Sequence, residues 1–167
     1  MSRVDHSRTR SFRVLLLMQI IVRPPLWRAY PLLRGLLIKK FMDPSTGNTT
    51  VFVVDDDESV RDSIVVLLQV HGFEVEAFAS VAEFVSGYRK PRRGCVVLDH
   101  CMPGTTGLDF LESEEGRTLE IPVILITGVP HLGLERRAQG AGATSFLRKP
   151  VGTKLLIERI KIAIERL

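Results

Sequence analysis

Short apolar runs alternate with longer segments of helical period along the chain from Val51 onward. The apolar runs predict five strands, at Val51–Asp55, Phe73–Phe78, Cys95–Leu98, Ile121–Ile126 and Thr144–Leu147. The helical segments predict five helices, at Glu58–His71, Ser80–Tyr88 (with Ser80 as its cap), Gly107–Glu115, His131–Gln139 and Lys154–Leu167. Strands and helices that alternate in this way are typical of βα units and of an α/β fold with a parallel sheet.

The patterns differ among these elements, and the differences predict their places. The run Ile121–Ile126 is almost continuously apolar, as a central parallel strand requires. The run Phe73–Phe78 alternates with a period of two and suits a half-exposed edge strand. The segment His131–Gln139 is a poor helix, because Gly133 lies within it and Gly140 ends it. A helical glycine costs about 1 kcal/mol relative to alanine.

Length and composition suit a single globular domain. The chain has 167 residues, 45% of them hydrophobic, which allows one sizeable core and leaves no room for a second. The net charge of +4 is uneven, because residues 1–41 carry nine basic and one acidic side chain and the rest is net acidic. The basic character therefore belongs to the N-terminal segment and does not indicate that the folded part binds nucleic acid.

Residues 1–50 form a basic N-terminal extension before a domain at 51–167. We expect this extension either to be disordered or to result from a translation start that is assigned too far upstream. Its apolar run Val14–Val22 is too short for a membrane span, which needs roughly 20 residues. We expect translation to start at Met42, which opens a polar lead-in to the first strand. A membrane-surface segment and a targeting peptide stay open as alternatives.

The two cysteines, Cys95 and Cys101, lie six residues apart, at the start of a predicted strand and in the loop after it. This extended span does not suit disulfide geometry, and two cysteines make no disulfide framework. Reduced thiols in a cytoplasmic protein are the interpretation that fits this spacing best.

Polar side chains follow the predicted strands at the edge where open α/β sheets bind ligands. They are Asp55 and Asp56 after the first strand, Asp99 after the third, Thr127 after the fourth and Lys149 after the fifth. Like charges about 4 Å apart repel by about 4 kcal/mol, and a hard cation relieves this repulsion. The set predicts a site for Mg²⁺ and a transferable phosphoryl group. Taken singly, its members also suit helix caps, a strand-end turn and a solvated surface charge.

Asp99 is the candidate nucleophile, since a carboxylate can attack phosphorus to form an acyl phosphate. A divalent cation would neutralise charge on the transferring oxygens. Lys149 would contact the same group, and the hydroxyl of Thr127 would donate a hydrogen bond to a phosphoryl oxygen. A Mg²⁺-dependent phosphatase that uses Asp99 stays open as an alternative, although the sequence offers it neither a general acid nor a substrate cap.

The chain from Val51 to Leu167 resembles the receiver domain of two-component response regulators. Four stretches carry the resemblance: VVDDDESVR, VVLDHCMPGTTGLDFL, IPVILITG and AGATSFLRKP. They are most similar to the receivers of nodulation and nitrogen-fixation regulators. The resemblance implies a flavodoxin-like, doubly wound (βα)5 fold of three layers, with a parallel sheet in the strand order 2-1-3-4-5.

The resemblance also implies roles for residues at the strand ends. Asp99 matches the phosphoacceptor. Asp56 matches the acid that binds Mg²⁺ directly, and Asp55 the acid that binds it through water. The main-chain carbonyl of Cys101 matches the remaining protein ligand. Mg²⁺ is therefore the expected cofactor, with Asp55, Asp56, Asp99 and Cys101 as its ligand set.

Further matches concern the response to phosphorylation. Thr127 matches the switch hydroxyl, and Phe146 matches the aromatic that turns inward when Thr127 moves toward the phosphoryl group. A buried core phenylalanine is the other interpretation of Phe146. Lys149 matches the lysine that contacts the phosphoryl group, before a cis bond to Pro150.

The chain departs from the common pattern beside the predicted phosphoryl site. His100 and Cys101 follow Asp99, where aliphatic and basic residues are more usual. The segment 129–131 stiffens the loop after the fourth strand, because it contains a proline. We expect these side chains to alter how fast water reaches the phosphoryl group.

These features predict a stand-alone receiver that catalyses only its own phosphorylation and dephosphorylation. A sensor histidine kinase would supply the phosphoryl group, and the face around the last two helices would change shape toward a protein partner. The last helix carries Leu155, Ile157 and Ile162 outside its core stripe, either for a homodimer or for burial against the preceding helix. No helix-turn-helix follows, so we expect no direct nucleic acid binding. A fragment of a longer DNA-binding transcription regulator stays open as the alternative.

Overall fold

The computed structural model describes residues 49–89, 93–129 and 132–166. Contacts divide the chain into two units, at 1–45 and 46–167, and all described residues lie in the second. The predictions for residues 1–48, including the start at Met42, lie outside the described residues, as do Pro130 and His131. Among the residues described, no helix has the length and apolar character needed to cross a membrane.

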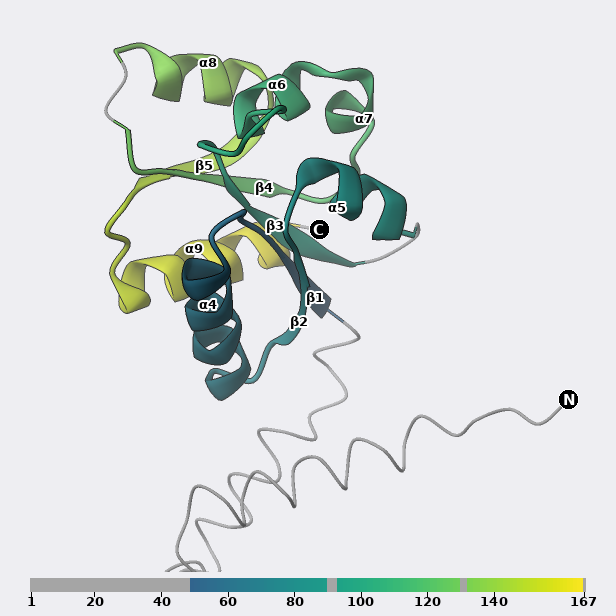
Figure 1. Cartoon of the computed structure of the whole chain (residues 1–167). Helices are drawn as coiled ribbons and strands as arrows, with labels where there is room; N and C mark the ends of the chain where they lie inside the picture. The colour runs from purple at the N-terminus through teal and green to yellow at the C-terminus, as the bar shows by residue number, and fades with distance from the viewer. Residues whose placement is uncertain (1–48, 90–92, 130–131, 167) are drawn as a thin grey trace, which may run out of the picture. The chain divides into compact units, whose positions relative to one another are not determined.

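Five parallel strands form one sheet in the order β2-β1-β3-β4-β5 (Figure 1). They are β1 (Thr49–Val54), β2 (Glu74–Phe78), β3 (Arg93–Asp99), β4 (Val123–Thr127) and β5 (Ala143–Arg148). This order confirms the predicted doubly wound topology. Every strand begins and ends within two residues of its predicted bounds.

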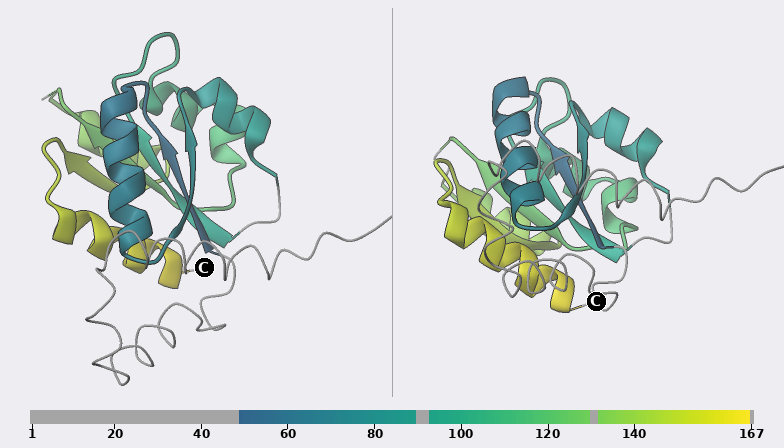
Figure 2. Two further views of the ribbon diagram at one scale, coloured as in Figure 1. Left: turned by 60° about the horizontal axis from the view of Figure 1, so that its bottom comes forward. Right: turned by 90° about the horizontal axis from the view of Figure 1, so that it is seen from below.

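Helices cover both faces of this sheet, which makes the three predicted layers (Figure 2). On one face lie α4 (Glu58–Val70) and α9 (Thr153–Glu165). On the other face lie α5 (Val81–Gly87), α6 (Gly107–Glu112) and α8 (Leu134–Gly140). A single turn of helix, α7 (Glu114–Arg117), follows α6.

Strand β1 shows why the sheet needs apolar residues at successive positions. Val51 and Val53 pack into the core beneath α4 and α9, whereas Phe52 and Val54 pack into the core beneath α5, α6 and α8. All four side chains are fully buried. Successive side chains of a strand point to opposite faces, so a strand covered on both faces is apolar throughout. The edge strand β2 is partly exposed, as its alternating pattern predicts.

The helix predicted at Gly107–Glu115 is divided in two. Ser113 has an extended conformation, with φ −75° and ψ 169°, and it separates α6 from α7. Its hydroxyl accepts a hydrogen bond from the main-chain N–H of Gly116, so Ser113 caps the new helix. The prediction of one continuous helix was wrong because a serine can serve as an N-cap as well as a helical residue.

The helix after β4 is short, in agreement with its weak pattern. Gly133 precedes α8 rather than lying inside it, and it adopts the left-handed conformation with φ +84°. Glycine makes no side-chain hydrogen bond at the start of this helix. By contrast, the Ser80 hydroxyl caps α5 as predicted, by accepting a hydrogen bond from the Glu83 N–H.

The last helix buries more of its apolar residues than its sequence pattern predicts. Ile157 has 7% of its surface exposed and belongs to the core with Leu156 and Ile160. It is therefore not part of an outer patch. Leu155 is exposed and Ile162 is half-buried, so these two residues are what remains of the predicted surface.

Candidate functional site

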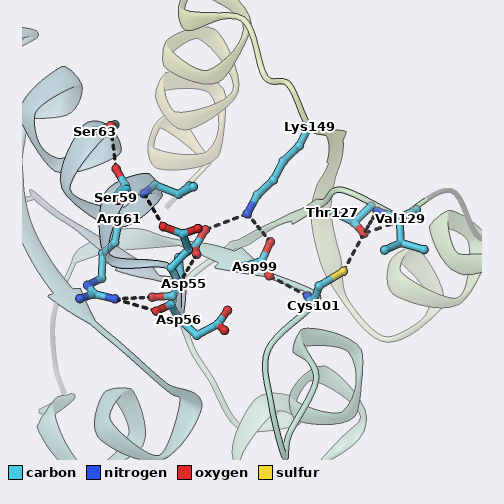
Figure 3. Close-up of polar contacts among 12 residues, drawn as sticks. Asp55, Asp56, Ser59, Arg61, Ser63, Asp99, Cys101, Thr127, Val129 and Lys149 are labelled. Carbon is cyan, nitrogen blue, oxygen red and sulfur yellow. Dashed lines mark hydrogen bonds and ion pairs between the residues drawn. The ribbon is translucent and has the colours of Figure 1, made fainter.

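The residues predicted for the site lie at the carboxyl edge of the sheet, where neighbouring strands end (Figure 3). Asp55 and Asp56 directly follow β1, and Asp99 is the last residue of β3. Thr127 is the last residue of β4, and Lys149 directly follows β5. Because these four strands are parallel neighbours, their ends bring together residues that are far apart in the sequence.

Three carboxylates form an acidic cluster, consisting of Asp55, Asp56 and Asp99. One oxygen from each lies within 4.8 Å of the others. Asp55 and Asp99 are buried, with 3% and 4% of their surfaces exposed, whereas Asp56 is exposed. Burial removes the water that stabilises an ionised carboxylate, so the acidic cluster favours a nearby cation.

Lys149 supplies one positive charge to the acidic cluster. Its Nζ lies 2.9 Å from Asp55 Oδ2 and 2.7 Å from Asp99 Oδ1. Burial lowers the pKa of Lys149, but the interactions with Asp99 and Asp55 outweigh burial and raise this pKa overall. Burial raises the pKa of Asp55, even though the hydrogen bond and charge of Lys149 act against it. Lys149 therefore stays charged, whereas burial makes the ionised form of Asp55 less favourable.

Main-chain N–H groups orient the two buried carboxylates. The Asp57 N–H donates to Asp55 Oδ1 at 3.0 Å, and the Cys101 N–H donates to Asp99 Oδ2 at 2.7 Å. In each carboxylate, the other oxygen is the one that meets Lys149. The loop after each strand thus holds its own carboxylate in place.

Arg61 holds the loop after β1, a role that sequence reasoning missed. Its Nη1 donates to the main-chain carbonyl of Asp55 at 2.8 Å and lies 3.4 Å from that of Asp56 (Figure 3). Arg61 lies near the start of α4, where the helix dipole favours acidic side chains. A basic residue near the start of a helix is unfavourable for the helix dipole, and this was the signal in the sequence that could have identified the role of Arg61.

The hydroxyl of Thr127 meets the loop that follows Asp99. Thr127 is buried, with 2% of its surface exposed. Its Oγ1 accepts a hydrogen bond from the Val129 N–H at 3.2 Å and lies 3.5 Å from Cys101 Sγ. Cys101 and Cys95 are both free thiols, as their spacing predicts, and burial raises the pKa of Cys95 to about 12.

Phe146 is half-buried in β5 and packs against the core beneath α5, α6 and α8. This packing agrees with a core phenylalanine, and its role as a switch stays a prediction. The Lys149–Pro150 peptide bond is cis, as predicted. Gly107 lies directly against the main chain of Asp99, because a Cβ there would lie 2.5 Å from the carbonyl oxygen of Asp99.

The acidic cluster fits Mg²⁺ by its donor chemistry. Mg²⁺ prefers oxygen ligands and is commonly held by one or two carboxylates together with water. The acidic cluster offers carboxylate oxygens only, and exposed Asp56 leaves it open to solvent. The carbonyl of Cys101 stays a predicted ligand, while its N–H is engaged with Asp99.

Comparison with known families decides what kind of domain this is. The sequence profile of the response regulator receiver domain matches residues 51–161. The chain belongs to the response regulator receiver family. The match runs from β1 into α9, so it includes every strand end that contributes to the site.

Two curated relatives of this receiver are of the nodulation and nitrogen-fixation type, as the resemblance implied. The chain is 38% identical over 116 residues to nodulation protein W of Bradyrhizobium diazoefficiens, which covers 70% of this chain and 51% of that protein. It is 35% identical over 116 residues to the transcriptional regulatory protein FixJ of Azorhizobium caulinodans, covering 70% of this chain and 55% of that protein. The receiver chain thus spans about half the length of these relatives.

Solved structures agree with the fold. The response regulator StyR is 38% identical, with a TM-score of 0.67, over 72% of this chain and 61% of that chain. The structure of FixJ-N is 35% identical, with a TM-score of 0.65, over 71% of this chain and 95% of that chain.

Proposed function

We propose that residues 51–167 act as a phosphoacceptor receiver in a two-component system, with Asp99 as the residue that is phosphorylated. The observation that carries this proposal is the position of Asp99. Its buried carboxylate lies within the acidic cluster, and its Oδ1 is 2.7 Å from Lys149 Nζ. An acid held between a cation site and a lysine suits attack on a phosphoryl group, whose oxygens need positive charge.

In the proposed reaction, a carboxylate oxygen of Asp99 forms a bond to phosphorus while the nitrogen–phosphorus bond of a phosphohistidine donor breaks. Asp55, Asp56, Asp99 and the Cys101 carbonyl would hold Mg²⁺, which would supply neutralising charge for the phosphoryl oxygens. Lys149 leaves its ion pair with Asp99 and contacts a phosphoryl oxygen. The Cys101 N–H keeps the acceptor carboxylate oriented, since it already donates to Asp99 Oδ2.

The phosphorylated state would then be read by Thr127 and Phe146. The Thr127 hydroxyl donates to a phosphoryl oxygen, and Phe146 turns further into the core that it already borders. The surface around α8 and α9 changes as a result. We propose a cytoplasmic sensor histidine kinase system as the source of the phosphoryl group, and a protein partner or a second copy as the recipient of the signal.

Two observations support such contacts, and the first of them concerns α9. Leu155 on this helix is a large apolar side chain that is 41% exposed. A similar solved structure, 29% identical with a TM-score of 0.64, is the beryllofluoride-activated NtrC4 receiver domain dimer.

Labelling with acetyl phosphate and Mg²⁺ tests the proposal directly. We expect the wild-type chain to form one acid-labile, base-labile phosphoryl adduct, and Asp99→Asn to form none. Asp62→Asn is the matched control, because Asp62 is an exposed acid on α4 outside the acidic cluster. Persistent labelling of Asp99→Asn would move the acceptor to another residue.

A second candidate is the receiver part of a longer transcription regulator. The lengths favour it, because this chain covers only 51% and 55% of two relatives, one of them named a transcriptional regulatory protein. Reading the genomic sequence beyond the codon for residue 167 tests this candidate. A helix-turn-helix in the same frame would support it, and an immediate stop codon would reject it.

A further inference from the structure

The thiol of Cys101 joins the acceptor loop to the hydroxyl of Thr127 (Figure 3). Cys101 lies two residues after Asp99, and its main-chain N–H already donates to Asp99 Oδ2. Its Sγ lies 3.5 Å from Thr127 Oγ1, across a sequence separation of 26 residues. One residue therefore holds the acceptor carboxylate with its main chain and the threonine hydroxyl with its side chain.

The hydroxyl of Thr127 has one proton to donate. It accepts a hydrogen bond from the Val129 N–H at 3.2 Å. Within the described part of the chain, its proton has two acceptors in reach, the Val129 carbonyl at 3.4 Å and the Cys101 sulfur at 3.5 Å. An oxygen–oxygen distance of 3.4 Å is long for a hydroxyl hydrogen bond, whereas the larger sulfur atom makes weak hydrogen bonds at such distances.

We propose that Cys101 is a positioning residue for the Thr127 hydroxyl. Its thiol stabilises the hydroxyl in the arrangement of the empty site, and this contact is given up when Thr127 donates to a phosphoryl group on Asp99. The inference rests on the proposed function, because it assumes that Thr127 serves the phosphoryl group. Occupation of the site therefore competes with the thiol–hydroxyl contact.

Binding of beryllofluoride, a phosphoryl mimic, in the presence of Mg²⁺ measures this competition by NMR titration. We expect Cys101→Ala to lower the Kd for beryllofluoride about two- to threefold, because a weak hydrogen bond of the empty site is lost.

A second background separates positioning from a simple change of side-chain size. In Thr127→Val, which lacks the hydroxyl, Cys101→Ala should no longer change the Kd. Cys95→Ala is the matched control, because Cys95 is buried in the core beneath α4 and α9 and leaves the Cys101–Thr127 contact intact. It should leave the Kd for beryllofluoride unchanged.

Two outcomes overturn the inference: an unchanged or higher Kd in Cys101→Ala, or the same fold-change from Cys101→Ala in the Thr127→Val background. If any of these occurs while wild type binds beryllofluoride and Asp99→Asn does not, the proposed function stands and only the role of Cys101 fails. If wild type does not bind beryllofluoride, the proposed function itself fails.

Discussion

Asp55 is the residue at which burial and charge compete most directly. Its carboxylate is buried, and burial raises its pKa despite the ion pair with Lys149. An acid whose pKa is higher in the folded state than in the unfolded chain binds its proton more tightly when folded. Its ionisation therefore lowers stability as the pH rises through the interval between the two pKa values.

Asp55→Asn should raise the free energy of unfolding near neutral pH in the presence of EDTA, because it removes a buried charge that burial disfavours. The amide carries no charge, and Lys149 keeps its ion pair with Asp99. The gain should disappear as the pH falls below 3.8, the ordinary value for this side chain, because Asp55 is then protonated in both states. Urea unfolding at a series of pH values measures the effect.

The control for this experiment is Asp62→Asn, which removes an exposed charge from α4. Its free energy of unfolding should stay within about 0.5 kcal/mol of wild type at each pH. If Asp55→Asn were less stable than wild type near neutral pH in EDTA, the ion pair with Lys149 would outweigh the effect of burial, and the account of Asp55 would be wrong.

At the scale of elements, α8 is a helix with weak local support. It has 7 residues, and its N-cap glycine makes no side-chain hydrogen bond. Short, poorly capped helices open at a lower free energy than the rest of a domain. Because α8 follows the loop after Thr127, a low opening free energy suits an element that moves when the site is occupied.

Two neighbouring glycines test this description of α8. Gly140→Ala should raise the free energy of unfolding by about 0.5 kcal/mol, since a Cβ there meets nothing within 4 Å and alanine favours the helix. Gly142→Ala should lower it by about 1 kcal/mol, because Gly142 has φ +98°. Urea unfolding measures both, and hydrogen exchange should slow at α8 amides in the first variant only. Equal effects of the same sign would contradict this account.

At the scale of the whole molecule, the acidic cluster links the ends of β1 and β3. These strands pair along their length, and the residues at their carboxyl ends bring one oxygen of each of three carboxylates within 4.8 Å of the others. A cation bound there interacts with the folded chain and not with the unfolded one, in which these residues are far apart. Mg²⁺ binding should therefore stabilise the entire domain.

Mg²⁺ at about 100 times its Kd should raise the free energy of unfolding by about 2.7 kcal/mol. Asp56→Asn should remove most of this gain, because it takes one carboxylate from the acidic cluster. Asp57→Asn removes the same charge one residue later and retains a good helix cap, so it should keep the gain. Thermal unfolding with Mg²⁺ and with EDTA measures the difference. Equal losses in both variants would show that net charge alone attracts the ion.

Much of the fold was predictable because both faces of the sheet are buried. Runs such as Val51–Val54 are apolar at every position only when helices cover both sides, and this pattern predicts parallel strands. The division at Ser113 was not predictable, because a serine inside a helical segment is compatible with a helix and with a cap. Ile157 was misplaced because periodicity does not show how closely α9 approaches the sheet.

The order of residues along the chain determined which side chains stand at the strand ends, and therefore that Asp55, Asp56, Asp99 and Lys149 share one edge. The runs of strand-forming residues stop at or next to these polar positions, so each strand ends within one residue of its predicted end. Only the tertiary structure decided that Arg61 binds the loop after β1 and that the Cys101 thiol reaches Thr127. Such contacts depend on rotamers and on distances between loops, which no local pattern of the sequence encodes.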